Sequence, residues 1–365
     1  MKKYKSALIG CGRISLSHIN AFTKNIHDYD LLAVCDLIPE RCNTVILEYC
    51  KLDPNKIIKK FTNYKEMLTE IKPEIVTIAT ESGRHSEIAI DCLNAGAHVI
   101  CEKPMALSSK DADSMILTAK ITKKKLAIAF QNRFNTPILK IRDAISNQRF
   151  GKILHGMIQI RWNRNQEYYS EARWRGTWKE DGGTLMNQCI HGIDLLQWIL
   201  GEDAVRVQAQ TRRFLRHIEA EDFGAAIVEF KNGAVGIIEG SAIIFPKNLN
   251  ETLSIFGDKG SAVISGLAVN KIETWRFADA DFIGDTEEQV LCSIEKDPPN
   301  VYGFGHTALF KDFVESINNN RDPVITGENG KKALDIVLGI YKSQKTGKAV
   351  ELPCDFSTEE MEGFF

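Results

Sequence analysis

Lys103 is the residue of this 365-residue chain whose neighbours best suit it to proton transfer. It follows the apolar run His98 to Cys101 and lies within Glu102-Lys103-Pro104. A lysine held between a buried strand and a proline can have its pKa lowered by burial, and can then accept a proton. The alternative is an ordinary solvated surface charge, which is the usual state of lysine.

A second group of polar side chains lies between residues 181 and 194. Asn187, His191 and Asp194 are spaced four and three residues apart, so a helix would place them on one face. An imidazole flanked by an amide and a carboxylate is typical of an oriented acid/base group. A lone histidine in such an apolar segment is more often a core residue, and that alternative stays open.

A glycine-rich turn and a later aspartate predict a dinucleotide site. Gly10-x-Gly12-x-x-Ser15 lies between an apolar strand and a helix that begins near Arg13. Gly10 allows a tight turn, Gly12 lets the backbone approach a pyrophosphate, and the helix offers its free N–H groups. Asp36 ends the next strand, where a carboxylate binds both adenosine ribose hydroxyls and repels a 2′-phosphate, unless it only caps a turn. We therefore expect NAD rather than NADP.

Strands and helices that would position these residues alternate through the first third of the chain. This alternation predicts an α/β domain of the Rossmann type, with a doubly wound parallel sheet covered by helices. The strands are expected at Tyr4 to Ile9, Leu31 to Cys35, near Ile57, Ile75 to Ala79, His98 to Cys101 and Leu126 to Ala129. The helices are expected at Ser15 to Asn25, Glu40 to Tyr49, Tyr64 to Ile71, Ser86 to Asn94 and Ser109 to Lys120.

The pattern changes after about residue 150 to consecutive strands with little helix between them. It predicts an α+β domain with an open-faced mixed or antiparallel sheet. The strands are expected at Ile153 to Trp162, Val205 to Phe214, Gly224 to Phe230, Ala234 to Ala242 and Leu253 to Phe256, and closing helices at His306 to Ile317 and Lys331 to Gln344. We expect an NAD-binding domain over residues 1–130 and a substrate-binding and oligomerisation domain over residues 131–365.

The composition favours a cytoplasmic protein that acts on small molecules. A formal net charge of -2 offers no basic surface for nucleic acid or for a membrane. No apolar run approaches the roughly 20 residues of a membrane span, and the run before Gly10 is too short for a signal peptide. The nine cysteines include no Cys-x-x-Cys pair, so we expect neither a disulfide framework nor a metal site.

The segment from Arg161 to Trp178 is rich in arginine and aromatic residues. Arginines bind phosphates and carboxylates in a bidentate manner, and aromatic rings can stack on a base or a sugar. The alternative is a structural loop whose tryptophans fill the domain junction. The candidate substrate-binding residues are Arg161, Arg164, Tyr169, Trp174, Arg175 and Thr177, followed by Asn187 and Gln188.

Taken together, these motifs resemble the glucose–fructose oxidoreductase/inositol dehydrogenase/MocA family. The resemblance covers essentially the whole chain and includes Glu102-Lys103-Pro104, the Gly-Gly…Asn-x-x-x-His-x-x-Asp run, Ala79-Thr80 with His85, and the segment Phe130 to Asn135. It implies that Lys103 and His191 flank the sugar or polyol hydroxyl that is oxidised. The cofactor contacts that it implies are Gly10, Gly12, Arg13, Ile14, Asp36, Thr80, His85, Glu102, Lys103 and Gln131.

Two positions depart from the family pattern. Asn187 stands where many members have an aspartate, and asparagine cannot act as a base. The proton is then left to His191 or Lys103, and the sequence does not choose between them. Thr80-Glu81-Ser82-Gly83 replaces a Thr-Pro-Asn-like turn, which weakens the transfer of cofactor contacts at that turn.

Within the family, the run from Trp174 to Trp178 with Asn187-Gln188 is similar to the bacterial UDP-N-acetylglucosaminuronate 3-dehydrogenases. That resemblance implies oxidation of C3 of a nucleotide sugar for surface polysaccharide synthesis. A diphosphate and a carboxylate would explain the arginines better than a neutral polyol. Some relatives regenerate NAD with 2-oxoglutarate. A homodimer or homotetramer is expected, because open-faced sheets often pair with another subunit and because the family resemblance implies it.

Three other functions remain as alternatives. A free-sugar or inositol dehydrogenase of the same family would not need the arginines. An NAD-dependent glycosidase would release free sugar without net NADH. A non-catalytic NAD-binding regulator would not need both Lys103 and His191.

Overall fold

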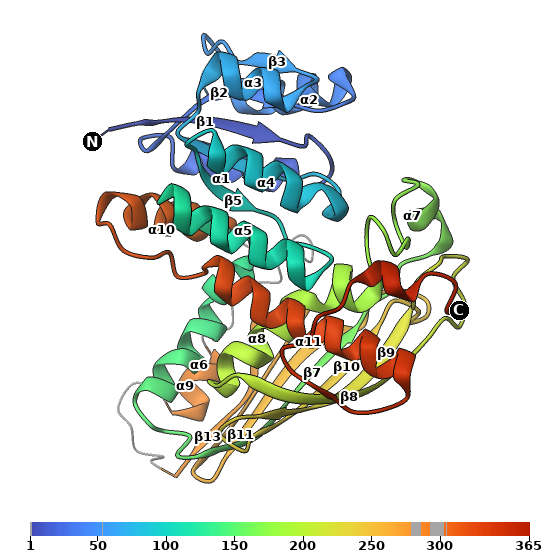
Figure 1. Cartoon of the computed structure of the whole chain (residues 1–365). Coiled ribbons are helices and arrows are strands. Elements are labelled where there is room, and N and C mark those ends of the chain that lie inside the picture. The colour runs from blue at the N-terminus through green and yellow to red at the C-terminus, as the bar shows by residue number, and fades with distance from the viewer. Residues whose placement is uncertain (1, 53, 279–285, 293–302, 304) are drawn as a thin grey trace. The chain divides into compact units, whose positions relative to one another are not determined.

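The computed structural model describes residues 2–52, 54–278, 286–292, 303 and 305–365, and the chain forms two units (Figure 1). The first unit contains Met1–Phe130 and His306–Lys331, and the second contains Gln131–Gly305 and Lys332–Phe365. Every residue after 130 was expected to lie in the second domain, whereas residues 306–331 belong to the first unit. In the part of the chain that the structure describes, no helix is long and apolar enough to cross a membrane.

A six-stranded parallel sheet forms the centre of the first unit. Its strand order is β3-β2-β1-β4-β5-β6, which is the order of a dinucleotide-binding doubly wound sheet. The strands are β1 (Tyr4–Ile9), β2 (Tyr29–Cys35), β3 (Lys59–Phe61), β4 (Ile75–Ile78), β5 (His98–Cys101) and β6 (Leu126–Ile128). Every residue of β4 is buried, as expected for a strand covered by helices on both faces.

The helices of this unit begin where the sequence offers capping residues. The side chain of Asn63 accepts a hydrogen bond from the Lys65 peptide nitrogen before α3 (Tyr64–Ile71). The side chain of Ser108 accepts one from the Asp111 peptide nitrogen before α5 (Ser109–Thr122). The helices are α1 (Ser15–Lys24), α2 (Pro39–Cys50), α3 (Tyr64–Ile71), α4 (His85–Asn94), α5 (Ser109–Thr122) and α10 (His306–Asn318).

Aromatic packing explains why α10 belongs to the first unit. Phe310 of α10 packs edge-on against Phe22 of α1, with ring centroids 5.0 Å apart. The Tyr29 hydroxyl donates a hydrogen bond to the carbonyl oxygen of Phe310 at 2.7 Å. These buried contacts join segments almost 300 residues apart, so local sequence patterns cannot predict them.

An eight-stranded mixed sheet forms the centre of the second unit, with the order β13-β12-β11-β7-β10-β9-β8-β14. β7 and β10 are parallel and the other neighbours are antiparallel. The strands are β7 (Ile153–Arg161), β8 (Ala204–Arg212), β9 (Phe223–Phe230), β10 (Val235–Ser241), β11 (Asn250–Gly257), β12 (Gly260–Ser265), β13 (Lys271–Phe277) and β14 (Val350–Glu351).

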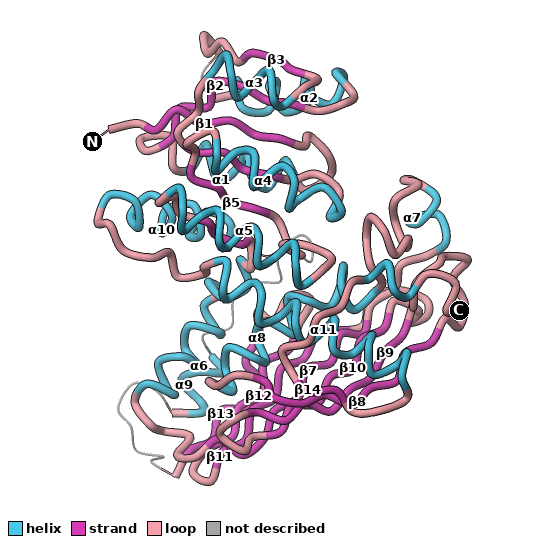
Figure 2. Tube along the Cα trace, viewed as in Figure 1, coloured by secondary structure: helices cyan, strands magenta, loops and turns pink. Residues whose placement is uncertain are grey.

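Helices cover one face of this sheet, as the cyan tubes in Figure 2 show. α8 packs across β7, β10 and β11, and α6 contacts β12. The helices of this part are α6 (Thr136–Ser146), α7 (Gln166–Ser170), α8 (Ile190–Leu200), α9 (Glu287–Cys292) and α11 (Gly327–Thr346), and the boundary between the units falls inside α11.

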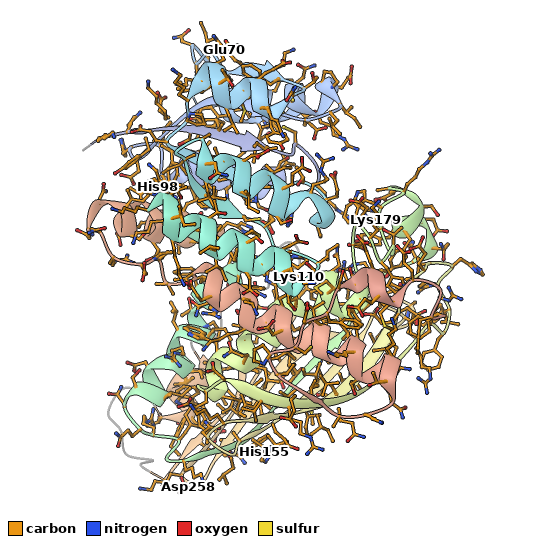
Figure 3. All side chains as sticks on the ribbon, viewed as in Figure 1. Glu70, His98, Lys110, His155, Lys179 and Asp258 are labelled. Atoms are coloured by element: carbon orange, nitrogen blue, oxygen red, sulfur yellow. The ribbon has the colours of Figure 1, made fainter. Side chains whose placement is uncertain are left out.

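The opposite face of the sheet leaves apolar side chains exposed. Ile227 of β9 is 56% exposed, and it is paired with the half-buried Ile237 of β10. The ring of His155, labelled in Figure 3, stacks on Phe256 of the neighbouring strand at 4.7 Å. This open face agrees with the sheet predicted from the strand pattern.

Candidate active site

The turn after β1 has the backbone geometry that a dinucleotide requires. Gly10 has a φ of 94°, and a Cβ there would lie 2.3 Å from the carbonyl oxygen of Ala79. A Cβ at Gly12 would meet no heavy atom within 4 Å, so this backbone borders open space. The Ser15 hydroxyl closes the turn by donating to the Gly12 carbonyl at 2.6 Å. The turn therefore leaves room for a pyrophosphate at the start of α1.

Asp36 follows β2 and braces the same turn. Its Oδ2 accepts a hydrogen bond from the Cys11 peptide nitrogen, and its Oδ1 accepts one from that of Ile38, both at 2.8 Å. Carboxylate oxygens have further lone pairs, so ribose hydroxyls can still bind here. Arg13 is exposed and Ile14 is half-buried beside the start of α1. These residues fit NAD.

The turns that follow β4 and β5 are joined by His85. Its Nδ1 lies 2.7 Å from the carbonyl oxygen of Pro104, and its Nε2 lies 3.1 Å from that of Thr80. Burial lowers the pKa of His85, so the neutral ring donates to one of these carbonyls. Lys103 is half-buried directly after β5.

Glu102 is buried beside Lys103, and its carboxylate folds back onto the Lys103 peptide nitrogen at 3.3 Å. His18 Nε2 lies 2.9 Å from Glu102 Oε1. Burial alone would raise the pKa of Glu102, but the imidazoles of His18 and His306 hold it well below its ordinary value.

In the second unit, Asn187 and Gln188 lie in a π-helical turn, Leu185–Cys189, that leads into α8. The Asn187 amide nitrogen donates to Asp181, and its oxygen accepts from Gln188 Nε2 at 2.5 Å. Arg164 Nε donates in turn to Gln188 Oε1 at 2.8 Å. Four of the polar side chains in the predicted region therefore form one hydrogen-bonded chain, which orients Asn187.

His191 and Asp194 occupy the first turns of α8, and both are buried. Both oxygens of Asp194 accept hydrogen bonds from Arg133, from Nε at 2.7 Å and from Nη2 at 2.6 Å. Gln131 is buried in the same short turn as Arg133. The Asp194 carboxylate is thus engaged in holding this turn against α8.

Two of the predicted arginines are paired with carboxylates. Arg161 makes a bidentate ion pair with Glu239 at 2.9 and 2.8 Å. Arg175 donates to Glu171 at 2.7 Å, and its guanidinium lies over the Tyr168 ring, 4.2 Å from the centroid. Within the chain, these two charges are already matched.

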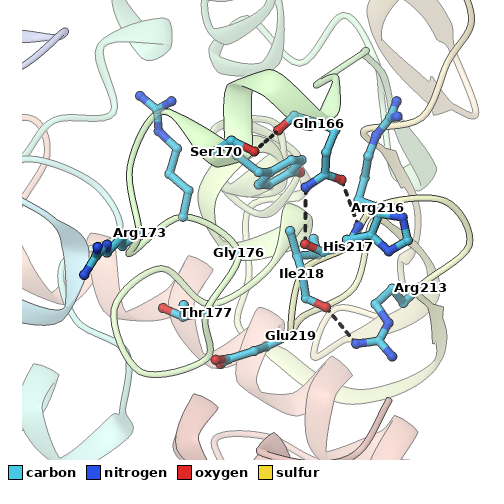
Figure 4. A pocket seen from close by; sticks show the side chains of 12 residues that line it. Gln166, Ser170, Arg173, Gly176, Thr177, Arg213, Arg216, His217, Ile218 and Glu219 are labelled. Atoms are coloured by element: carbon cyan, nitrogen blue, oxygen red, sulfur yellow. Dashed lines mark hydrogen bonds between the residues drawn. The ribbon is translucent and has the colours of Figure 1, made fainter.

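A cavity of about 550 Å³ opens between the α7 loop and residues 213–219 (Figure 4). Gln166 joins its two sides, because its Oε1 accepts from the His217 peptide nitrogen at 2.9 Å. Among the predicted residues, Tyr169, Arg175 and Thr177 line the cavity. Thr177 also donates to the carbonyl oxygen of Trp174 at 2.7 Å.

Sequence reasoning missed Arg213, Arg216 and His217, which line the same cavity as Arg173. The signal was the run from Arg212 to His217, which is basic and aromatic like the earlier loop. The first part of this run was expected to belong to a strand that ends at Phe214. The strand ends at Arg212, because the Asp222 carboxylate accepts hydrogen bonds from the peptide nitrogens of residues 214, 215 and 216 and turns the chain outward.

Glu221 is a further residue that the sequence patterns did not indicate. It is fully buried, and its Oε1 accepts from the Leu185 peptide nitrogen at 2.8 Å and from the Tyr341 hydroxyl at 3.0 Å. Gly183 makes room for it, since a Cβ there would lie 1.6 Å from Glu221 Oε2. Burial raises the pKa of Glu221 to about 8. Glu221 therefore supports the turn that carries Asn187.

Two solved structures are similar to this chain over nearly its whole length. The WlbA dehydrogenase of Bordetella pertussis, in complex with NADH and UDP-GlcNAcA, is 33% identical, with 97% of this chain and 100% of that chain covered and a TM-score of 0.84. The WlbA dehydrogenase of Chromobacterium violaceum, with the same two ligands, is 34% identical, with 98% of each chain covered and a TM-score of 0.86.

Two family models match successive parts of the chain. Residues 4–130 match the oxidoreductase family model with an NAD-binding Rossmann fold, and residues 138–263 match the GFO/IDH/MocA C-terminal domain. Among characterised relatives, the myo-inositol 2-dehydrogenase of Thermotoga maritima is 25% identical over 352 residues, covering 94% of this chain and 97% of that protein.

Proposed function

Because the chain belongs to the glucose–fructose oxidoreductase/inositol dehydrogenase/MocA family, we propose that this NAD-dependent dehydrogenase oxidises a nucleotide-linked sugar acid. We propose UDP-N-acetylglucosaminuronate as the substrate and C3 as the carbon oxidised, giving a 3-keto nucleotide sugar for surface polysaccharide synthesis. The observation that carries this proposal is the 33–34% identity, over nearly the whole chain, to two dehydrogenases crystallised with NADH and UDP-GlcNAcA.

The arginine-lined cavity supports an anionic substrate. Arg173, Arg213 and Arg216 line it together with a single carboxylate, that of Glu219. Arg175 also lines the cavity, but it is paired with Glu171. The other three arginines are therefore the main source of positive charge around the cavity. A diphosphate or a uronate carboxylate matches such a surface, whereas a neutral polyol gains little from it.

In this proposal each group has a separate task. When bound, NAD accepts a hydride from the carbon that is oxidised. Lys103 or His191 accepts the hydroxyl proton, because Asn187 has no basic atom. The chain from Arg164 through Gln188 to Asn187 orients the amide that contacts the sugar. Gly10, Gly12 and Asp36 hold the cofactor.

The first experiment measures NADH absorbance with NAD and UDP-N-acetylglucosaminuronate, with and without 2-oxoglutarate, beside glucose and myo-inositol. NADH or 2-hydroxyglutarate formed only with the nucleotide sugar supports the proposal, and NMR of the product identifies the oxidised carbon. Turnover of the free polyols alone would overturn it.

Two charge-matched variants test the cavity. R216A removes a cavity arginine and should raise the KM for the nucleotide sugar about tenfold, the effect of one charge-assisted hydrogen bond. K179A removes an exposed cation outside the cavity lining (Lys179 in Figure 3) and should leave KM unchanged. Equal effects of the two variants would contradict a phosphate or carboxylate site here.

An inositol dehydrogenase is the second candidate. The 25% identity to the Thermotoga maritima enzyme over nearly the whole chain favours it. In that case myo-inositol would be oxidised, and R216A would leave its KM unchanged.

We also propose that the chain self-associates through the open face of the larger sheet. Exposed Ile227 and its half-buried partner Ile237 offer apolar area there. Light scattering should give a dimer or tetramer that I227D dissociates, and a monomeric wild-type protein would overturn this.

A further inference from the structure

Three buried ionisable side chains meet at the carboxyl end of β5, all within the first unit. Glu102 follows β5, His18 lies in α1, and His306 begins α10. Their side chains are 7%, 0% and 6% exposed, and one ligand-type atom from each lies within 4.8 Å of the others. Nothing in the reaction described above uses either histidine.

The hydrogen-bond pattern defines the charge of this group. An ionised carboxylate only accepts, so His18 Nε2 must donate to Glu102 Oε1 across their 2.9 Å contact. His18 Nδ1 is buried and has no hydrogen-bond partner among the described residues. His306 Nε2 lies 3.5 Å from the same oxygen, and burial lowers the pKa of His306.

Other titratable groups near Glu102 do not neutralise it. Cys101 precedes it in β5, and His85 faces it from α4; burial raises the pKa of the first and lowers that of the second. Both therefore remain uncharged at neutral pH. The hydrogen bonds from His18 and from the Lys103 peptide nitrogen therefore stabilise the Glu102 anion.

The contacts connect the cofactor turn to the lysine. His18 lies in the first turn of α1, directly after the Gly10–Gly12 turn, and it holds Glu102 Oε1. Glu102 Oε2 accepts from the Lys103 peptide nitrogen, so the carboxylate determines how the chain leaves β5. A shift of α1 would therefore be passed to Lys103.

We infer that His18 is a positioning residue for the oxidation: it holds the Glu102 carboxylate against the Lys103 peptide and so couples the cofactor turn to Lys103. His306 closes the pocket around the carboxylate. The inference rests on the proposed role of Lys103 at the reacting hydroxyl.

The test compares H18Q with H18L. The amide nitrogen of glutamine can replace Nε2 as the donor, whereas leucine cannot. H18L should lower kcat/KM about 10- to 100-fold, the range expected for a small misplacement of a reacting group, and H18Q should stay within about threefold of wild type. H98L removes a partly buried imidazole at the other end of β5, labelled in Figure 3, and should leave kcat/KM unchanged.

The pH profile separates positioning from simple structural support. Loss of the His18 donor should raise the pKa of Glu102. The acid limb of the kcat profile should therefore move to higher pH in H18L, and it should not move in H18Q. A lower kcat with an unshifted profile would overturn the inference. So would stoichiometric zinc in the purified protein, because His18, Glu102 and His306 would then be metal ligands.

A measurement without substrate keeps this test separate from the proposed function. In wild type the pKa of Glu102 is lower in the folded state than in the unfolded state, so its ionised form stabilises the fold at any pH above the unfolded-state pKa. That stabilisation is lost only in stronger acid. H18L should instead lose unfolding free energy relative to H18Q as the pH rises from about 5 to about 7. Parallel urea-denaturation curves for the two variants over this range would overturn the inference even if no substrate is turned over.

Discussion

Glu102 in the first unit and Glu251 in the second are both buried, but their pKa values are shifted in opposite directions. Glu102 receives hydrogen bonds from His18 and from the Lys103 peptide nitrogen, and its pKa lies well below the ordinary value. Neither oxygen of Glu251 has a hydrogen-bond partner among the described residues, and burial raises its pKa to about 8. The donors around a buried carboxyl, not burial itself, decide whether it is charged.

Glu221 stands between these two cases. One of its oxygens accepts two hydrogen bonds and the other accepts none among the described residues, and its pKa is raised to about 8. Neutral donors to one oxygen therefore do not offset full burial. In the first unit, the lowered pKa keeps Glu102 an anion beside Lys103. In the second unit, the raised pKa values favour the neutral forms of Glu221 and Glu251, which lie beneath the turn and helix that carry Asn187 and His191.

The largest predicted effect concerns how stability changes between about pH 4.5 and about pH 8. Because the folded pKa of Glu251 lies above its ordinary value of 4.5, the folded state binds more protons than the unfolded state between those values. The unfolding free energy of wild type should therefore fall as the pH rises from about 4.5 through about 8. E251Q does not titrate, so its stability relative to wild type should increase by roughly 4 kcal/mol across this range. Urea denaturation at several pH values measures it, and a constant difference would show that Glu251 is ionised throughout.

The next effect is on activity at neutral pH. E102Q replaces an anion that holds the Lys103 peptide and should lower kcat/KM about 10- to 100-fold, or about 1.4 to 2.7 kcal/mol. E251Q replaces a neutral acid of the same shape and should remain within about twofold of wild type. NADH formation by the two variants is the measurement. Equal losses would remove the distinction drawn between the two carboxyls.

The smallest effect concerns Tyr341, whose hydroxyl donates to Glu221 at 3.0 Å. Y341F removes one of the hydrogen bonds to this carboxyl and should lower the unfolding free energy by about 1 kcal/mol at neutral pH. It should also move the pKa of Glu221 further upward, since that bond favours the ionised form. Thermal unfolding at neutral and alkaline pH measures both. A variant as stable as wild type would show that the Leu185 peptide nitrogen alone supports this carboxyl.

Local patterns predicted most elements of the first unit closely. The expected strands Tyr4–Ile9 and His98–Cys101 and the helix Tyr64–Ile71 have the same bounds in the structure. Their signals are short-range: apolar runs between turns, and a capping asparagine. In the second unit β12 and β13 were not predicted. Short alternating strands give little signal until a neighbouring strand pairs with them.

Some of the candidate site residues that the sequence indicated contact one another in the structure. Arg164, Asn187 and Gln188 were singled out and form one hydrogen-bonded chain. Arg161 came from the same loop, but the structure pairs it with Glu239 of the neighbouring strand β10. Composition identified an arginine-rich loop, but it could not show which guanidinium groups line a cavity and which meet a carboxylate.

The sequence by itself determined the doubly wound sheet, the cofactor turn around Gly10 and Gly12, and the positions of Lys103 and His191 along the chain. These follow from residue alternation and backbone freedom within a few neighbours. Only the tertiary structure decided the return of α10 to the first unit, the lining of the cavity by Arg213 and Arg216, and the opposite ionisation of Glu102 and Glu251. Each of these depends on partners distant in sequence, and the charge of a buried group depends on which donors folding brings to it.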